Sequence, residues 1–206
     1  MKNDAYWNAF WSRLPRGAAP LEGSGWLSDK PRHQVVKAVD SRWLSAPAKV
    51  LDVGCGVGNT AAWLAERGFA VIGMDLSEEA IARASVRCAH VTWIIGDCTS
   101  PRDFGPFDVI LDCGTVHQLD QHDRLAYVDN LRSWTKPGSR LFLLMRYGEP
   151  LFGSTTRESL IEQVNALFAF CFEIRHIEDV DMDEANREPR PGLEIRLERV
   201  AGAPRQ

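Results

Sequence analysis

Residues 50–59 read Val50-Leu51-Asp52-Val53-Gly54-Cys55-Gly56-Val57-Gly58-Asn59, an apolar run followed by a loop with glycine at alternate positions. The apolar run is typical of a buried strand. Three glycines let the main chain turn sharply, admit a ligand against bare backbone and start the next helix close to the strand. A plain turn between a strand and a helix would explain only one of them. The stretch therefore predicts a ligand-binding loop at the carboxyl end of a strand.

The remainder of the chain continues this alternation of strand and helix patterns. Further apolar runs suited to buried strands lie at Ala70–Met74, Val91–Ile95, Asp108–Leu111 and Arg140–Met145. After a helical pattern at about Arg157–Phe168, two more strands are expected at Phe172–Ile177 and Glu194–Val200. We predict an α/β fold: a seven-strand, Rossmann-like, doubly wound sheet that ends in an antiparallel C-terminal β-hairpin. The acidic residues 179–191 between the last two strands suit a solvated loop, with contact to a cationic substrate as the alternative.

The ends of the next strands carry further polar residues. Asp75 ends the second strand, where a carboxylate can accept both hydroxyls of a ribose. Gly96-Asp97-Cys98 follows the third strand, and Asp97 is either a ligand contact or an ordinary turn residue. In doubly wound sheets ligands bind outside the carboxyl ends of the strands, so these residues and the glycine loop are candidates for one site.

Together these motifs resemble those of class I methyltransferases that depend on S-adenosylmethionine (SAM). The loop spacing is G-x-G-x-G, whereas dinucleotide-binding loops read G-x-G-x-x-G, and Lys136-Pro137-Gly138-Ser139 is similar to the family's K-P-G-G turn before the fifth strand. The resemblance implies that Asp52, Gly54 and Gly56 line the methionine end of SAM, that Asp75 binds its ribose and that Asp97 accepts from its adenine. It also implies that a backbone carbonyl at Cys113 meets the SAM ammonium. Three neighbours along the chain, Cys55, Leu76 and Cys98, are placed at the cofactor on the same grounds.

The N-terminal segment carries an aromatic stripe at helical spacing, formed by Tyr6, Trp7, Phe10, Trp11 and Leu14. Such a stripe fits either the core or a binding site. With Trp26 it is similar to the tryptophan-rich cover of thiopurine, thiol, halide and tellurite methyltransferases, which implies that Trp11 contacts the cofactor. We expect a single domain over residues 1–206, with residues 1–46 as a helical lid segment and residues 47–206 as the catalytic core.

Two residues beyond the strand ends are candidate catalytic groups. His117 follows the fourth strand and is either a general base for a hydroxyl or amine acceptor, or a residue that caps the next segment. Tyr147 follows the fifth strand with Arg146 and Glu149 and is either a group that orients the acceptor or a surface residue. Methyl transfer from SAM needs neither a metal nor a covalent enzyme intermediate, so no metal ligands are expected.

Composition and absent motifs narrow the substrate to a small molecule. The formal net charge of −4 gives no sign of the excess positive charge that is typical of nucleic-acid-binding proteins. The fourth strand is not followed by the Asn/Asp-Pro-Pro-Tyr/Phe run of enzymes that methylate exocyclic amines of bases, and the chain has no Pro-Cys pair of the kind that cytosine C5 enzymes use. The chain has no apolar run long enough for a bilayer and no secretion signal at its N-terminus, so we expect a cytoplasmic protein without a membrane partner. Five dispersed cysteines without a C-x-x-C pair are expected to be reduced and mostly buried.

The function predicted from these features is methyl transfer from SAM, with S-adenosylhomocysteine as the product, to an oxygen, nitrogen or sulfur atom of a small molecule. Two alternatives stay open. A catalytically silent SAM-binding module that acts on a partner would keep the same motifs. An oxidoreductase that uses a nicotinamide dinucleotide is supported only by the glycine loop and Asp75.

Overall fold

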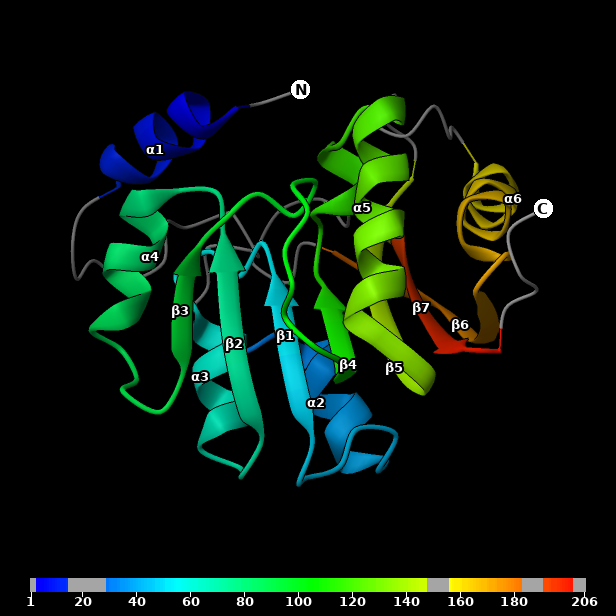
Figure 1. Ribbon diagram of the computed structural model, residues 1–206, viewed down its shortest axis with the longest axis horizontal. Helices are drawn as coiled ribbons and strands as arrows, with labels where there is room; N and C mark the ends of the chain where they lie inside the picture. The colour runs from blue at the N-terminus through cyan, green and yellow to red at the C-terminus, as the bar shows by residue number, and fades with distance from the viewer. Residues whose placement is uncertain (1–2, 15–28, 148–155, 183–190, 202–206) are drawn as a thin grey trace. The chain divides into compact units, whose positions relative to one another are not determined.

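The computed structural model describes residues 3–14, 29–147, 156–182 and 191–201 (Figure 1). These residues fall into two compact units, the first ending at Cys98 and the second beginning at Thr99. The strand order is β3-β2-β1-β4-β5-β7-β6 in a seven-stranded sheet, of which the first three strands belong to the first unit and the last four to the second. The predicted fold class is therefore confirmed. The division into a lid segment and a catalytic core stays a prediction.

Within residues 3–14 and 29–98, the first unit contains three parallel strands and four helices. Its elements are α1 (Asp4–Ser12), α2 (His33–Asp40), β1 (Lys49–Val53), α3 (Asn59–Ala65), β2 (Ala70–Asp75), α4 (Glu78–Ser85) and β3 (Thr92–Ile95). β2 pairs in parallel with β1 on one side and with β3 on the other. α3 packs on β2, and α4 packs on β2 and β3. Four of the five residues of β1 are buried, which is the pattern of a parallel strand covered on both faces.

Two elements of the first unit begin where the sequence supplies a suitable cap. α3 begins after Gly58, whose φ of 77° lies in the left-handed region that glycine adopts without strain. A side chain at Gly58 would also collide with the indole of Trp93 on β3. α4 begins after Ser77, whose hydroxyl accepts a hydrogen bond from the amide of Ala80 at 3.2 Å.

The second unit contains one parallel and two antiparallel strand pairs. Its elements are β4 (Phe107–Asp112), a 3₁₀ turn (Val116–Gln118), α5 (Gln121–Trp134), β5 (Thr135–Arg146), α6 (Arg157–Phe168), β6 (Phe172–Asp181) and β7 (Pro191–Arg199). β4 pairs in parallel with β5, whereas β7 pairs antiparallel with both β5 and β6. Figure 1 shows α5 in front of β5, and these two elements are in contact. Large buried side chains fill the core of this unit: Phe107, Tyr127, Trp134, Phe142, Phe168 and Phe172.

The antiparallel pair was predicted correctly, but its strands are longer than expected. β6 continues through Asp179 to Asp181, and β7 already begins at Pro191, so the predicted acidic loop is partly strand. The interpretation failed because β6 lies at the edge of the sheet, where acidic side chains point to solvent while the backbone stays paired. Residues 183–190 of the predicted loop lie outside the described residues.

The turn expected before the fifth strand is also part of a strand. β5 begins at Thr135, and its pairing with β4 shifts register between Phe107 and Val109. Gly138, with φ of 87°, lies in the irregular stretch that this shift creates. The Lys-Pro-Gly-Ser sequence therefore acts as a bulge within a strand rather than as a turn outside it.

Two further expectations concern the cysteines and the membrane. All five cysteines are described and free of disulfides, but only Cys98 and Cys171 are buried, whereas the other three are half-buried. Among the described residues, every helix is too short or too polar to cross a membrane.

Candidate functional site

The loop after β1 exposes main chain at the carboxyl end of the strand. Gly54, Gly56 and Gly58 all have positive φ, at 66°, 55° and 77°. The amide of Cys55 donates to the carbonyl of Met74 at 3.0 Å, and the amide of Gly58 donates to the carbonyl of Cys55 at 3.0 Å. These hydrogen bonds hold the loop in one conformation, and Gly54 remains exposed at its surface. The loop can thus accept a ligand directly against its backbone.

The carboxylate of Asp75 ties the end of β2 to this loop. One oxygen, Oδ2, accepts a hydrogen bond from the amide of Gly56 at 2.8 Å, and Oδ1 accepts from the amide of Ser77 at 2.9 Å. Burial raises the pKa of Asp75, and the hydrogen bonds from Ser77 and Gly56 oppose that rise. Each carboxylate oxygen has a second lone pair, so Asp75 can still accept from two ligand hydroxyls. Asp52, at the end of the neighbouring β1, is itself buried.

Trp11 of α1 lies against the same loop. A Cβ built on Gly56 would lie 3.1 Å from Cζ2 of Trp11, so the indole sits directly on bare glycine backbone. Trp11 is buried, whereas Tyr6 on the same helix is exposed, so the aromatic stripe is not a uniform face. Trp26, the third tryptophan of the predicted cover, lies outside the described residues.

Hydrogen bonds across a long stretch of chain hold α1 in this position. Oδ1 of Asn8 accepts from the hydroxyl of Ser77 at 2.7 Å and from the amide of Glu79 at 3.3 Å. Arg83 of α4 donates to the carbonyl of Leu14 at 2.7 Å. This role of Asn8 was not predicted, because nothing in the sequence pattern around Asn8 indicates a partner on α4.

The other predicted cofactor residues of the first unit follow β2 and β3. The amide of Gly96 donates to the carbonyl of Asp75 at 2.9 Å, which joins the ends of these strands. Asp97 is half-buried directly after this contact, and Cys98 is buried. Leu76 is half-buried between Asp75 and Ser77. The strand pairing therefore gathers Asp75, Leu76 and Asp97 at one edge, as predicted for a ligand site.

The thiol of Cys55 lies in the loop itself. Burial, followed by the negative charges of Asp52 and Asp75, raises the pKa of Cys55 well above its ordinary value. The thiol stays protonated at neutral pH, so Cys55 is not a nucleophile. Its thiol donates to the carbonyl of Gly56 at 3.7 Å, and its backbone amide and carbonyl also form hydrogen bonds that hold the loop.

In the second unit, Asp112 ends β4 and is completely buried. Its Oδ1 accepts hydrogen bonds from the amides of Gly114 at 3.1 Å and Thr115 at 2.6 Å, and its Oδ2 accepts from the amide of Val116 at 3.0 Å. Burial raises the pKa of Asp112 to about 6 against the opposing effect of these hydrogen bonds. Asp112 was not predicted as a site residue, although its place at a strand end matches that of Asp75.

His117 lies in the turn that Asp112 organises. Its ring is buried, and a Cβ built on Gly114 would lie 3.2 Å from Cε1 of His117. Gly114, with φ of 112°, thus gives the imidazole room close to the main chain after β4. Cys113, between Asp112 and Gly114, is half-buried. His117 is therefore a rigidly placed histidine in this unit.

Tyr147 follows β5 and contacts β6. Its hydroxyl donates to Oδ1 of Asp179 at 3.3 Å, and Nε of Arg157 lies 2.9 Å from both carboxylate oxygens of Asp179. Desolvation, together with the negative charge of Asp179, raises the pKa of Tyr147. A tyrosine with a raised pKa is a hydrogen-bond donor rather than a base. Glu149 lies outside the described residues.

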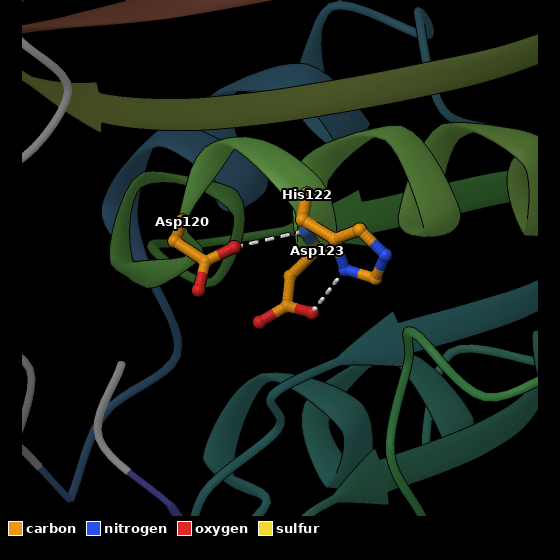
Figure 2. Close-up of side chains that lie close together, drawn as sticks. All are labelled: Asp120, His122 and Asp123. Atoms are coloured by element: carbon orange, nitrogen blue, oxygen red, sulfur yellow. Dashed lines mark hydrogen bonds and ion pairs between the residues drawn. The ribbon is translucent and has the colours of Figure 1, made fainter.

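A cluster of Asp120, His122 and Asp123 lies at the start of α5 (Figure 2). Oδ1 of Asp120 accepts from the amide of Asp123 at 3.0 Å, and Nδ1 of His122 lies 3.4 Å from Oδ1 of Asp123. The hydrogen bond from Asp123 lowers the pKa of Asp120. This pattern is a helix N-cap with an exposed histidine beside it, and the helix start explains its carboxylates.

Comparison with known proteins finds similarity to methyltransferases. A family model described as a methyltransferase domain matches residues 50–138. Phosphoethanolamine N-methyltransferase 1 of Triticum aestivum is 35% identical over 128 residues, which cover 59% of this chain and 25% of that protein. An uncharacterized methyltransferase of Schizosaccharomyces pombe is 33% identical over 99 residues, which cover 46% of this chain and 68% of that protein. The chain spans 25% to 60% of the length of the first three curated relatives that it matches.

Solved structures share the fold. A protein studied for the conversion of a disulfide bond into a thioacetal group during echinomycin biosynthesis superposes with a TM-score of 0.78 at 20% identity, covering 96% of this chain and 93% of that one. The 1,6-didemethyltoxoflavin-N1-methyltransferase of Burkholderia thailandensis, with 1,6-didemethyltoxoflavin and S-adenosylhomocysteine bound, superposes with a TM-score of 0.64 at 20% identity, covering 82% of this chain and 78% of that one.

Proposed function

This chain belongs to the class I SAM-dependent methyltransferase family, and on that premise we propose that it transfers a methyl group from SAM to a small molecule. The observation that carries the proposal is the glycine loop of the first unit, with Asp75 bonded to its backbone and Trp11 lying on Gly56. These three features combine exposed main chain, a carboxylate with free lone pairs and an aromatic face.

The residues of the first unit fit SAM by their chemistry. Gly54 leaves main chain open to the methionine end, because it is exposed and carries no Cβ, whereas the indole of Trp11 covers Gly56. Asp75 has acceptor capacity for the ribose hydroxyls beyond its bonds to Gly56 and Ser77. An indole such as that of Trp11 attracts a cation by about 0.5 to 2 kcal/mol. SAM, when bound, supplies a methyl group on a positively charged sulfur, which is a good leaving group.

The related proteins support a small-molecule acceptor. The wheat relative is named for phosphoethanolamine, and the Burkholderia structure holds 1,6-didemethyltoxoflavin together with S-adenosylhomocysteine. The net charge of −4 agrees with an acceptor other than nucleic acid. We propose the same class of acceptor for this chain, with an oxygen, nitrogen or sulfur atom as the site of methylation.

We propose that His117 removes the proton when the acceptor is a hydroxyl or an amine. The imidazole can hold a proton near neutral pH, and its burial in the turn after β4 keeps it in one orientation. Asp112 supports this role indirectly, since its carboxylate binds the three amides that precede His117. A thiol acceptor ionises by itself and would use His117 less.

We assign Tyr147 to positioning rather than to proton removal. Its hydroxyl is held by Asp179, and its raised pKa keeps it protonated. A protonated phenol near the carboxyl end of β5 can donate to a polar atom of the acceptor after a small rotation. Arg157 holds Asp179 in place for this arrangement.

The proposal is tested by titrating the purified chain with S-adenosylhomocysteine and with NAD in a calorimeter. We expect binding of the first ligand and none of the second, because the loop spacing is that of a SAM site. Turnover of candidate acceptors with labelled SAM then separates an enzyme from a silent SAM-binding module. Binding of NAD in place of S-adenosylhomocysteine would reverse the proposal.

A further inference from the structure

One face of the β6–β7 pair carries charged residues on neighbouring rungs. His176 of β6 lies opposite Arg196 of β7, and Glu178 lies opposite Glu194. Two carboxylates directly opposite each other across a strand pair repel and need a compensating positive group. Arg196 pairs with Oε1 of Glu194 and offsets the charge of one carboxylate. Glu178 lies close to His176, with Oε2 of Glu178 3.6 Å from Nε2 of His176.

A β-bulge places His176 on this face. The pairing of β6 with β7 shifts register between Ile174 and His176, so Arg175 is the extra residue. Without the shift, strict alternation would put His176 on the same face as Ile174. With it, Ile174 and Ile177 share one face while His176 joins Glu178 on the other. Bulges often re-aim side chains at a site, and here the bulge puts His176 and Glu178 together on the face that carries Glu194.

Glu194 has an oxygen that lacks a partner. The residue is fully buried, and Oε2 is without a hydrogen-bond partner among the residues that the structure describes. A buried carboxylate oxygen without a partner destabilises a fold by more than a typical hydrogen bond stabilises it, so such an oxygen needs an explanation. One ligand atom each from His176, Glu178 and Glu194 lie within 4.8 Å of one another. Glu194, which carries the orphaned oxygen, therefore belongs to a group of three potential metal ligands.

We propose that His176, Glu178 and Glu194 bind a divalent transition-metal ion of the Zn²⁺ type. An imidazole nitrogen and two carboxylate oxygens are a ligand set that Zn²⁺ accepts, with water completing its coordination. Arg196 holds the other oxygen of Glu194, as outer partners commonly orient metal-bound carboxylates. The side chains of His176 and Glu178 are 45% and 38% exposed, which gives the ion a route from solvent. The site lies across the antiparallel pair, with two ligands on β6 and one on β7, so its role is to brace β6 against β7.

The cluster at the start of α5 differs from the β6–β7 cluster in burial, and this difference supports the β6–β7 cluster as the metal site. It also brings a histidine and two carboxylates together, but Asp120 is exposed and already serves as a helix cap (Figure 2). Proximity alone therefore does not define a site. What distinguishes the β6–β7 cluster is a buried carboxylate with an oxygen that none of the described residues satisfies.

The experiment is a Zn²⁺ titration of the full chain after removal of metals with a chelator, read by competition with a chromophoric zinc indicator. We expect one Zn²⁺ per chain. His176→Ala and Glu194→Gln should each weaken the affinity by more than about tenfold, since even outer partners of metal ligands contribute about 10-fold to 100-fold. His122→Ala, the matched change in the α5 cluster, should leave the affinity unchanged. In thermal melts, Zn²⁺ should raise the Tm of the wild type and of His122→Ala but not that of His176→Ala.

Three results would overturn the proposal. They are the absence of Zn²⁺ binding by the wild type, equal binding by the wild type and His176→Ala, and loss of binding in His122→Ala alone. The first would mean that the contact between His176 and Glu178 completes the network without any metal. If Glu194→Gln does not fold, the His176→Ala variant decides, because its side chain is half-exposed and its removal leaves the core intact.

Discussion

Asp75 and Asp112 occupy the same kind of position in the two units, at the end of a parallel strand, but their carboxylates have different roles. Each follows the last apolar residue of a parallel strand, accepts hydrogen bonds from amides of the next turn and has its pKa raised by burial. Asp75 is partly exposed and accepts two amides, so it keeps lone pairs for a ligand. Asp112 is fully buried and its two oxygens accept three amides. The same carboxylate position can thus bind a ligand or build a turn, and exposure decides which.

The largest expected effect is on turnover, and it tests whether the turn that Asp112 stabilises positions His117 as a general base. His117→Ala should lower turnover of a hydroxyl or amine acceptor by about 10² to 10⁴ while the affinity for SAM changes little. The pH profile of kcat should also lose its rising limb near the pKa of an imidazole. Steady-state kinetics and calorimetry on the same variant provide both measurements. Full turnover of an oxygen acceptor would remove His117 from the reaction and direct attention to Glu149.

The second effect is on folding. Asp112→Ala should lower the free energy of unfolding by about 3 kcal/mol or more, because it leaves several buried amides without an acceptor at about 1 to 3 kcal/mol each. Chemical denaturation followed by fluorescence measures this loss. Asp75→Ala is the matched change in the first unit and should cost less, since it leaves two amides rather than three without an acceptor. Equal losses in the two variants would remove the distinction drawn between them.

The third effect is on cofactor affinity. Asp75→Ala should weaken binding of S-adenosylhomocysteine by about tenfold to a hundredfold, which corresponds to losing one charged hydrogen-bonding group at about 1.5 to 3 kcal/mol. Calorimetric titration gives the dissociation constants. Asp75→Asn, which retains one acceptor oxygen, should fall between the wild type and the alanine variant. An unchanged dissociation constant in a folded Asp75→Ala chain would show that this carboxylate does not bind the ribose.

The fourth effect follows from the pKa of Asp112, which burial raises from 3.8 to about 6. Between about pH 4 and 6 the folded chain holds this proton and the unfolded chain does not, so stability from Asp112 falls as the pH rises. The total change is about 1 to 3 kcal/mol, because a tenfold difference in proton affinity between the folded and unfolded chains corresponds to about 1.4 kcal/mol. The free energy of unfolding of the wild type, minus that of Asp112→Asn, should decline across this range. A difference that stays flat or rises with pH would contradict a raised pKa for Asp112 in the folded chain.

The smallest effect concerns Tyr147. Tyr147→Phe removes a hydroxyl 3.3 Å from Asp179 at an exposed position, so stability should change by about 0.5 kcal/mol or less. If the hydroxyl positions the acceptor, KM should rise severalfold while kcat changes little. A loss confined to kcat would instead give Tyr147 a part in the chemical step.

The amino-acid sequence alone was enough to predict the cofactor loop and the strands that surround it. The glycine spacing, Asp75 and the apolar runs are local features, and each encodes its own backbone geometry within a few residues. Trp11 was chosen by resemblance, and the structure places it against Gly56, while its contact with a cofactor stays a prediction.

Only the tertiary structure revealed contacts between residues far apart in the chain. Asn8 meets Ser77 across 69 positions, and Tyr147 meets Asp179 across 32, with no sequence pattern to link either pair. The bulge at Arg175 and the burial of Glu194 likewise depend on how β6 pairs with β7. The sequence by itself determined the motifs whose chemistry lies in consecutive residues. Packing decided which carboxylates are buried, which are exposed and which side chains meet, because burial and contact are set by neighbours that the local sequence does not specify.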